Sequence, residues 1–170
     1  ILTNVFVECH RVLKNRRYCI VTFNNKEPEA WIAFLRAVKR AGFVLPKDGV
    51  MFQDGVESYK KTIDSRRDGA IFGDFIYSFW KSDDPPAKNT CFNWQSLVRD
   101  TLSKLSKTQQ PIKNADLYSQ LYFDLLPHLF SAIDSNDENS NQSITELNTK
   151  NLENKIREHF CREGNLWFPL

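Results

Sequence analysis

The chain has 170 residues and a formal net charge of +2, with 41% hydrophobic and 26% charged residues. These values are ordinary for a soluble globular protein and do not by themselves indicate a nucleic-acid partner. No apolar run reaches the roughly 18–20 residues of a membrane span, and the first residues show neither the basic flank nor the small-residue cleavage site typical of a signal peptide. We therefore expect a cytoplasmic protein. Its reduced, mostly buried thiols would be Cys9, Cys19, Cys91 and Cys161, none of which forms a CxxC pair.

The glycines and the methionine limit the kind of protein further. The six glycines include no pair spaced as GxG, which argues against a glycine-rich phosphate or dinucleotide loop in this chain. The only methionine is Met51, and the chain opens on Ile1–Phe6 as if inside an apolar helix. We expect a piece of a longer protein.

Helix and strand patterns alternate up to residue 81. Apolar spacing predicts a helix over 2–13, and the nearly continuous apolar run 18–23 predicts a strand buried on both faces of a parallel sheet. A second helix begins at Pro28 and stops at Gly42. Strands are expected at 43–45, continuing at 50–52, and at 70–80, the latter two pairing antiparallel. The stripe expected to pack the first helix is Leu2, Val5, Phe6, Cys9, Val12 and Leu13.

The pattern changes at residues 82–91, whose composition predicts a linker. Beyond it we expect three helices and a small hairpin, which is the outline of a winged-helix unit. Asn114 is the expected N-cap of the middle helix, and Pro127 is expected to bend or break it. The helices are predicted at 92–105, 115–133 and 147–160, a mobile loop at 134–143, and a hairpin at 161–168 with its turn at Gly164-Asn165.

Two polar segments are candidate binding sites. Asn24, Asn25 and Lys26 follow a predicted buried strand, and ligands of open α/β sheets bind beyond the carboxyl ends of strands. These side chains would bind a base or a cofactor, or the loop would simply cap the next helix. The second segment offers phosphate contacts and a stacking ring, or is a solvated connection whose acidic residues balance its charge. Its candidate residues are Tyr59, Lys60, Lys61, Arg66 and Arg67.

No complete active site is visible in the sequence. The three histidines, His10, His128 and His159, have no carboxylate or cysteine partner at ligand spacing, and no Ser–His–Asp arrangement can be argued. We therefore expect neither a catalytic residue nor a metal site in this chain.

Residues 6–43 read FVECHRVLKNRRYCIVTFNNKEPEAWIAFLRAVKRAGF. This stretch resembles the late part of the catalytic domain of S-adenosylmethionine-dependent methyltransferases. The likeness is greatest to bacterial DNA methylases, at Val21–Trp31 and Ala41–Phe43. The family's Pro-Gly-Gly turn is replaced here by Asn15-Arg16-Arg17. A later tetrapeptide, Asp84–Ala87, lacks the aromatic residue that ends the catalytic (D/N/S)-P-P-(Y/F/W) motif of the family, and is read as linker.

The resemblance implies an α/β fold in which residues 1–81 supply the fifth to seventh strands of a Rossmann-like seven-stranded sheet, the last strand antiparallel. Residues 82–91 are then a linker, and 92–170 a small, mainly helical accessory domain that contacts DNA or packs on the catalytic domain. The loop 24–26 would help to line the target-base pocket.

The implied function is that of a C-terminal fragment of a DNA amino-methyltransferase (N6-adenine or N4-cytosine), of the kind found in restriction–modification. The parent enzyme would use S-adenosylmethionine. The isolated chain, without the cofactor loop and catalytic motif, would bind no cofactor and be inactive. Its partners would be DNA and the remainder of the catalytic domain, with no membrane and no metal. The alternatives are a stand-alone nucleic-acid-binding or protein-interaction module, and a methyltransferase acting on RNA or protein.

Overall fold

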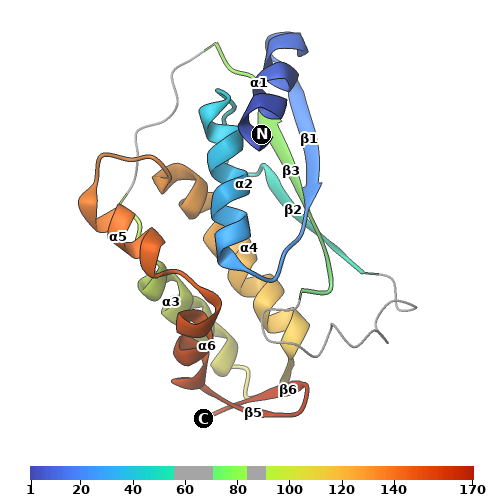
Figure 1. Ribbon diagram of the computed structural model, residues 1–170. Coiled ribbons are helices and arrows are strands. Elements are labelled where there is room, and N and C mark those ends of the chain that lie inside the picture. The colour runs from blue at the N-terminus through green and yellow to red at the C-terminus, as the bar shows by residue number, and fades with distance from the viewer. Residues whose placement is uncertain (56–70, 84–90) are drawn as a thin grey trace.

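A computed structural model describes residues 1–55, 71–83 and 91–170 (Figure 1). Within these residues the fold is mixed α/β, with six helices and two three-stranded antiparallel sheets. None of the described helices is long and apolar enough to cross a membrane. The helices are α1 Leu2–Val12, α2 Pro28–Arg40, α3 Trp94–Ser106, α4 Asn114–Ala132, α5 Glu138–Glu146 and α6 Thr149–Arg157. The strands are β1 Tyr18–Phe23, β2 Val50–Asp54, β3 Gly73–Trp80, β4 Ile112–Lys113, β5 Phe160–Glu163 and β6 Leu166–Pro169.

The first sheet has the strand order β1-β3-β2, and β3 is antiparallel to both neighbours. Tyr77 at its centre lies opposite Val21 on one side and Val50 on the other. The predicted antiparallel pairing of the second and third strands is confirmed. The second strand is shorter than predicted at its start, where Val44 makes only an isolated bridge to Trp80.

The prediction that β1 is buried on both faces of a parallel sheet is wrong. Its side chains alternate between exposed and partly buried, and Ile20 is 60% exposed. In register, Val21 and Phe23 lie on the face that carries the buried side chains of β3, whereas Ile20 points to the opposite face. A continuous apolar run does not reveal which face is covered, and the buried side chains of this sheet lie on one face among the described residues.

The helix α2 follows the predicted pattern. It begins at Pro28, buries Trp31 and Leu35 completely, and gives way at Ala41 to Gly42, whose φ of 96° favours glycine at this C′ position. The predicted helix α1 is also present, but the prediction that its whole apolar stripe packs is wrong. Phe6 is buried, with its ring 5.8 Å from that of Phe34 in α2. Exposed members of the stripe are Leu2, Val5 and Val12.

The long helix α4 departs from the prediction at two points. Its N-cap is Lys113, and the side-chain oxygen of the buried Asn114 instead accepts a hydrogen bond from the Trp167 indole at 2.9 Å. The helix also continues through Pro127 to Ala132. We attribute this continuity to packing, because the leucines on both sides of the proline are buried.

Residues 134–143, predicted to be a mobile loop, include most of the helix α5. Asp137 caps this helix by accepting a hydrogen bond from the Ser140 amide. The hydroxyl oxygens of Ser140 and Ser143 accept the backbone amides of Phe92 and Trp94 at 2.8 and 3.0 Å. The prediction is wrong because it rested on the lack of apolar residues. Here the helix is held to the rest of the fold by serine hydroxyls that accept buried backbone amides.

The C-terminal hairpin is confirmed, with Gly164 and Asn165 between β5 and β6. The short strand β4 pairs with β6 and completes the second sheet, of order β4-β6-β5. All four cysteines are free. None is fully buried, contrary to expectation, because Cys91 and Cys161 are exposed and Cys9 and Cys19 only partly buried.

One continuous hydrophobic core joins the two halves of the chain (Figure 1). The Trp31 ring of α2 lies 5.3 Å from Phe75 of β3 and 5.7 Å from Tyr122 of α4. Phe79 of β3 likewise lies 5.8 Å from Phe130 of α4. The second half therefore completes the core of the first. Of the predicted linker 82–91, residues 84–90 lie outside the described residues.

Candidate functional site

The predicted site loop begins directly after β1, at the edge of the sheet where β2 ends and β3 begins. The side-chain amide of Asn24 donates a hydrogen bond to the carbonyl oxygen of Gly73, the first residue of β3. Gly73 has a φ of 139°, and a Cβ atom there would lie 2.3 Å from the carbonyl oxygen of Gln53 and 2.6 Å from the Phe52 ring. Only glycine fits at this crossing, so Asn24 ties β1 to a tightly packed strand end.

The next two residues are held by α2 and α4. The Asn25 side-chain oxygen accepts the Glu27 amide at 2.9 Å, and its backbone carbonyl accepts the Trp31 indole at 2.8 Å. The Lys26 carbonyl accepts the Tyr122 hydroxyl at 3.3 Å. Burial first, and then nearby tyrosine and glutamate side chains, raise the pKa of Tyr122 well above its ordinary value, so its hydroxyl keeps its proton.

The structure therefore brings Asn24, Asn25 and Lys26 together as the predicted loop, with the two asparagines engaged in holding its shape. The Lys26 ammonium is about half exposed and lies 3.9 Å from the Glu27 carboxylate. It is the side chain of the three that faces solvent most openly. The acceptor contact of Asn25 is with the amide of Glu27, which is the N-cap residue of α2.

The second predicted site lies outside the described residues, which omit 56–70 and with them Tyr59, Lys60, Lys61, Arg66 and Arg67. The described residues on either side of this gap are joined by a hydrogen bond from the Gly55 amide to the Phe72 carbonyl, at 3.3 Å. The chain thus leaves and re-enters the described structure at the same sheet edge as the loop 24–26.

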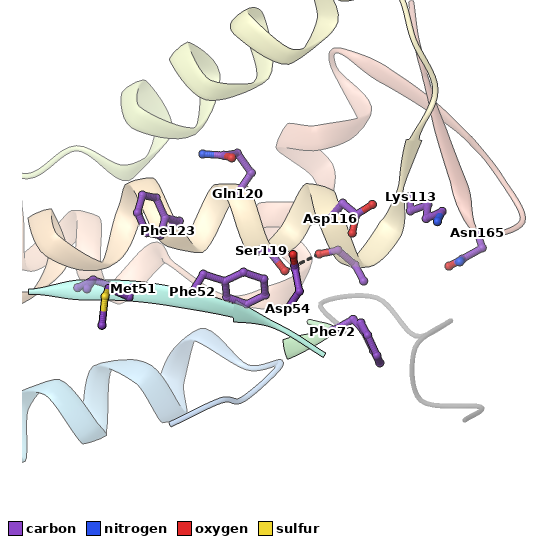
Figure 2. A pocket seen from close by; sticks show the side chains of 12 residues that line it. Met51, Phe52, Asp54, Phe72, Lys113, Asp116, Ser119, Gln120, Phe123 and Asn165 are labelled. Atoms are coloured by element: carbon purple, nitrogen blue, oxygen red, sulfur yellow. Dashed lines mark hydrogen bonds between the residues drawn. The ribbon is translucent and has the colours of Figure 1, made fainter. Parts of the chain in front are cut away.

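Sequence reasoning missed a cleft that lies between β2 and the first turns of α4 (Figure 2). Its volume is about 1030 Å³. One wall is β2, and the other is a face of α4 on which small residues, Ala115 and Ser119, are followed by Phe123. The remaining lining residues are Val50, Met51, Phe52, Asp54, Phe72, Lys113, Asp116, Gln120 and Asn165.

No sequence motif predicts this cleft. The α4 residues that line it belong to the side of the helix away from its leucine-rich core stripe. Such a polar face is ordinarily solvated, and only the position of β2 opposite it makes a cavity. The small side chains at Ala115 and Ser119, four residues apart, are the one signal present, since they leave room beside the helix.

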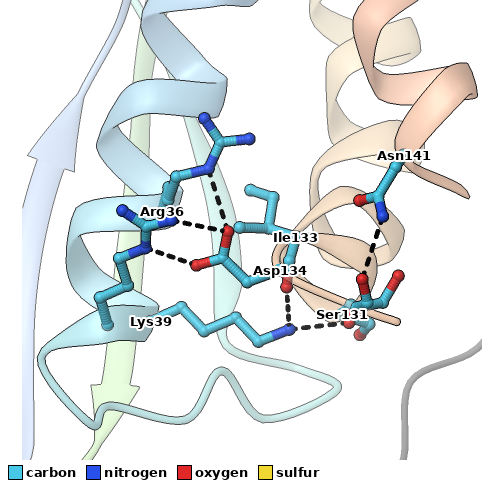
Figure 3. Close-up of polar contacts among 8 residues, drawn as sticks. Arg36, Lys39, Ser131, Ile133, Asp134 and Asn141 are labelled. Carbon is cyan, nitrogen blue, oxygen red and sulfur yellow. Dashed lines mark hydrogen bonds and ion pairs between the residues drawn. The ribbon is translucent and has the colours of Figure 1, made fainter. Parts of the chain in front are cut away.

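A cluster of charged groups fastens α2 to the end of α4 (Figure 3). Arg40 donates two hydrogen bonds to the Asp134 carboxylate, at 2.6 and 3.1 Å, and Arg36 lies 3.3 Å from the same group. The Lys39 ammonium donates to the carbonyls of Ser131 and Ile133 at 2.8 and 2.6 Å. Lys39 thus caps the helix end, where a cation is favoured.

These groups perturb one another's titration. Partial burial raises the pKa of Asp134, but the hydrogen bond and charge of Arg40, with the charges of Arg36 and Lys39, hold it below its ordinary value. Burial lowers the pKa of Lys39, and Asp134 opposes that shift. The cluster holds two parts of the chain together and contains no nucleophile–base pair, so its perturbed groups are best explained as an interface.

The side chain of His10, a residue of α1, lies against the residue that follows Gly42. The His10 ring packs against Phe43, with centroids 4.9 Å apart, and burial followed by the charge of Lys81 lowers the pKa of His10. Across residues 1–55, 71–83 and 91–170, no group of three or more histidine, cysteine, aspartate or glutamate side chains could hold a metal ion.

Comparison with known proteins gives no relative: no protein-family model, no curated protein and no solved structure matches this chain.

Proposed function

We propose that this chain is the C-terminal portion of an S-adenosylmethionine-dependent DNA amino-methyltransferase that modifies N6 of adenine or N4 of cytosine. The resemblance at residues 21–31 and 41–43 motivates the proposal. The first sheet supports it. β1 and β2 are both antiparallel to β3 and therefore run parallel to each other, and an antiparallel strand of this kind is what the resemblance implies for the end of the sheet.

The observation that carries the proposal is the open edge of β1. Among the described residues β1 pairs only with β3, so its other edge presents unpaired backbone groups. Its outward face exposes Ile20 and Tyr18, the latter by 52%, and the preceding helix α1 exposes Val5 and Val12. An unpaired strand edge next to exposed apolar side chains favours pairing with a further strand. In the proposed enzyme the earlier strands of the sheet continue from this edge.

Within that enzyme the loop 24–26 would lie at the carboxyl edge of the sheet, where ligands of such sheets bind. We assign Asn24 and Asn25 the positioning of the loop, through their contacts with Gly73 and Glu27, and Lys26 the group that faces the DNA. The cofactor would supply the methyl group. The described residues contain no glycine-rich loop to hold it, so no step of the transfer is assigned to this chain.

The helical half has a supporting role in this proposal. Its order of helix, strand, helices and hairpin, with β4 beside β6, supports a winged-helix unit. Residues 91–170 carry eight lysines and arginines against ten aspartates and glutamates, a balance that does not favour phosphate binding. The shared core and the contact of Arg40 with Asp134 favour packing on the catalytic half.

The proposal is tested by expressing the complete reading frame that contains this chain and comparing it with the chain alone. Calorimetry should show S-adenosylmethionine binding by the longer protein only. Methyl transfer from labelled cofactor to unmethylated DNA should follow the same pattern. Tight cofactor binding by the chain alone, or a longer protein that transfers no methyl group to DNA, would contradict the proposal.

A matched pair of variants tests the edge of β1. Ile20→Lys places a charge on the exposed face of β1, whereas Val7→Lys places one on the side of α1 that carries Arg11. In the chain alone both changes should leave the thermal midpoint nearly unchanged, since both residues are exposed. In the longer protein only Ile20→Lys should lower the midpoint and the methyl transfer. Equal tolerance of the two variants there would mean that nothing covers β1.

A further inference from the structure

The wall of the cleft formed by β2 presents backbone groups as well as side chains. The ladder between β2 and β3 is bracketed by hydrogen bonds from Ser78 to the Gly49 carbonyl, at 2.8 Å, and from Gly55 to the Phe72 carbonyl. In an antiparallel pair alternate residues bond across the ladder. Gly49, Met51, Gln53 and Gly55 therefore face β3, whereas the N–H and C=O groups of Phe52 and Asp54 point away from β3, toward the cleft.

No strand in the described part of the chain pairs with this outer edge of β2. On the opposite side of the cleft, the side chains of Ala115 and Ser119 in α4 project little from the helix. Both are small, and the Ser119 hydroxyl donates a hydrogen bond back to the Ala115 carbonyl at 2.8 Å. Figure 2 shows the resulting space running along β2 beside α4. An added strand would lie about 4.8 Å from β2.

The side chains around the cleft define what such a strand would carry. Asp54 and Asp116 are exposed carboxylates, and Lys113 is the one cation among the described lining residues. This balance disfavours a phosphate-bearing ligand and favours basic side chains. Phe52 is partly buried and Phe123 39% exposed, so an apolar surface is also available.

We propose that the cleft is a docking site for an extended peptide segment of a partner protein, which adds as a strand to the free edge of β2. On the side that faces α4, the segment carries an apolar residue and, two positions along, a basic residue, since side chains two positions apart in a strand share a face. Its backbone pairs with Phe52 and Asp54, its apolar side chain packs toward Phe123, and its basic side chain meets Asp54 and Asp116. Strand addition of this kind takes affinity from the backbone and specificity from alternate side chains. The site does not depend on the proposed methyltransferase function.

The probe for the test is a fluorescein-labelled hexapeptide of threonines with valine at the third position and lysine at the fifth, so that both side chains share one face of a strand. It is titrated into the 170-residue chain and followed by anisotropy. A version N-methylated at alternate backbone nitrogens cannot pair as a strand and should bind about tenfold more weakly. A valine–glutamate version should also bind more weakly. Equal binding of the N-methylated peptide would overturn the proposal. Saturable binding of a short oligothymidylate at the cleft, in place of the peptide, would overturn it in favour of nucleic acid.

Charge reversal distinguishes the cleft from the rest of the surface. Asp54→Lys combined with Asp116→Lys should weaken the lysine peptide about threefold to tenfold and strengthen the glutamate peptide. Asp100→Lys, at an exposed position of α3 outside the cleft, is the matched control and should change neither affinity. If the control has the same effect as the double variant, the binding is unspecific attraction to charge and the proposal fails.

Hydrogen exchange gives a readout that depends on the register of β2. With the lysine peptide bound, the amides of Phe52 and Asp54 should gain protection, because they point into the cleft. Met51 and Gln53, already bonded to β3, should change little. Protection that rises uniformly along β2, or not at all, would show that the peptide does not add as a strand.

Discussion

The two asparagines of the loop 24–26 allow a direct test of their assigned roles, because the same substitution should destabilise the fold at one position and not at the other. Asn24 acts as a donor, to the Gly73 carbonyl, and Asn25 acts as an acceptor, from the Glu27 amide at 2.9 Å. Asn24→Asp removes the donor and turns an oxygen toward a carbonyl oxygen. Asn25→Asp keeps the acceptor and adds a negative charge near the start of α2, where it is favoured.

The expected magnitudes follow from these contacts. Losing the hydrogen bond and leaving a partly buried carbonyl without its donor should cost about 1–3 kcal/mol for Asn24→Asp, whereas Asn25→Asp should stay within about 0.5 kcal/mol of the unaltered chain. Urea denaturation followed by tryptophan fluorescence measures both. With a slope near 2 kcal/mol/M, a loss of 2 kcal/mol moves the midpoint by about 1 M. Equal stabilities of the two variants would refute the assignment of Asn24 to the fold.

Ser140→Ala should destabilise the fold by about 1–3 kcal/mol, measured in urea against Asn139→Ala, because the buried Phe92 amide loses its acceptor; matching midpoints would contradict this. Gly73→Ala should lower the thermal midpoint and cost more than about 1 kcal/mol, since φ is 139° and the new Cβ meets a backbone oxygen; an unchanged midpoint would be the opposing result. Burial raises the pKa of Asp134, but neighbouring arginines hold it below its ordinary value. The Asp134 carboxylate therefore stabilises the fold fully above the ordinary aspartate pKa, and this stabilisation is lost as the pH falls through the lowered pKa of Asp134. Asp134→Asn should flatten this part of the profile of unfolding free energy against pH.

The predicted helices and strands agree with the structure wherever a local pattern and a local stop signal coincide. The stretch from Pro28 to Gly42 is the clearest case, since proline, the apolar spacing and the terminal glycine all indicate one helix. The prediction of a loop at residues 134–143 was wrong, because no local pattern in this apolar-poor segment indicates a helix. Their helix depends on Ser140 and Ser143 meeting the amides of Phe92 and Trp94, which lie far away in the sequence.

The candidate site was predictable in position but not in chemistry. That polar residues follow β1 at a sheet edge can be read from the order of residues 18–26. Whether Asn24 binds a ligand or a strand depends on Gly73, which is 49 residues further along the chain. The small residues Ala115 and Ser119 alone do not predict the cleft, because its walls come from β2 and α4 and meet only in the folded chain.

The continuous core gives the helical half a role in the shape of the loop 24–26. Trp31 donates to the Asn25 carbonyl and packs against Tyr122, and Tyr122 itself donates to the Lys26 carbonyl. One contact that fixes the loop comes from Trp31, which packs against Tyr122 of α4, and another comes from Tyr122 itself. Removal of residues 92–170 would expose Trp31 and free Lys26. The helical half therefore contributes directly to the geometry of the loop 24–26.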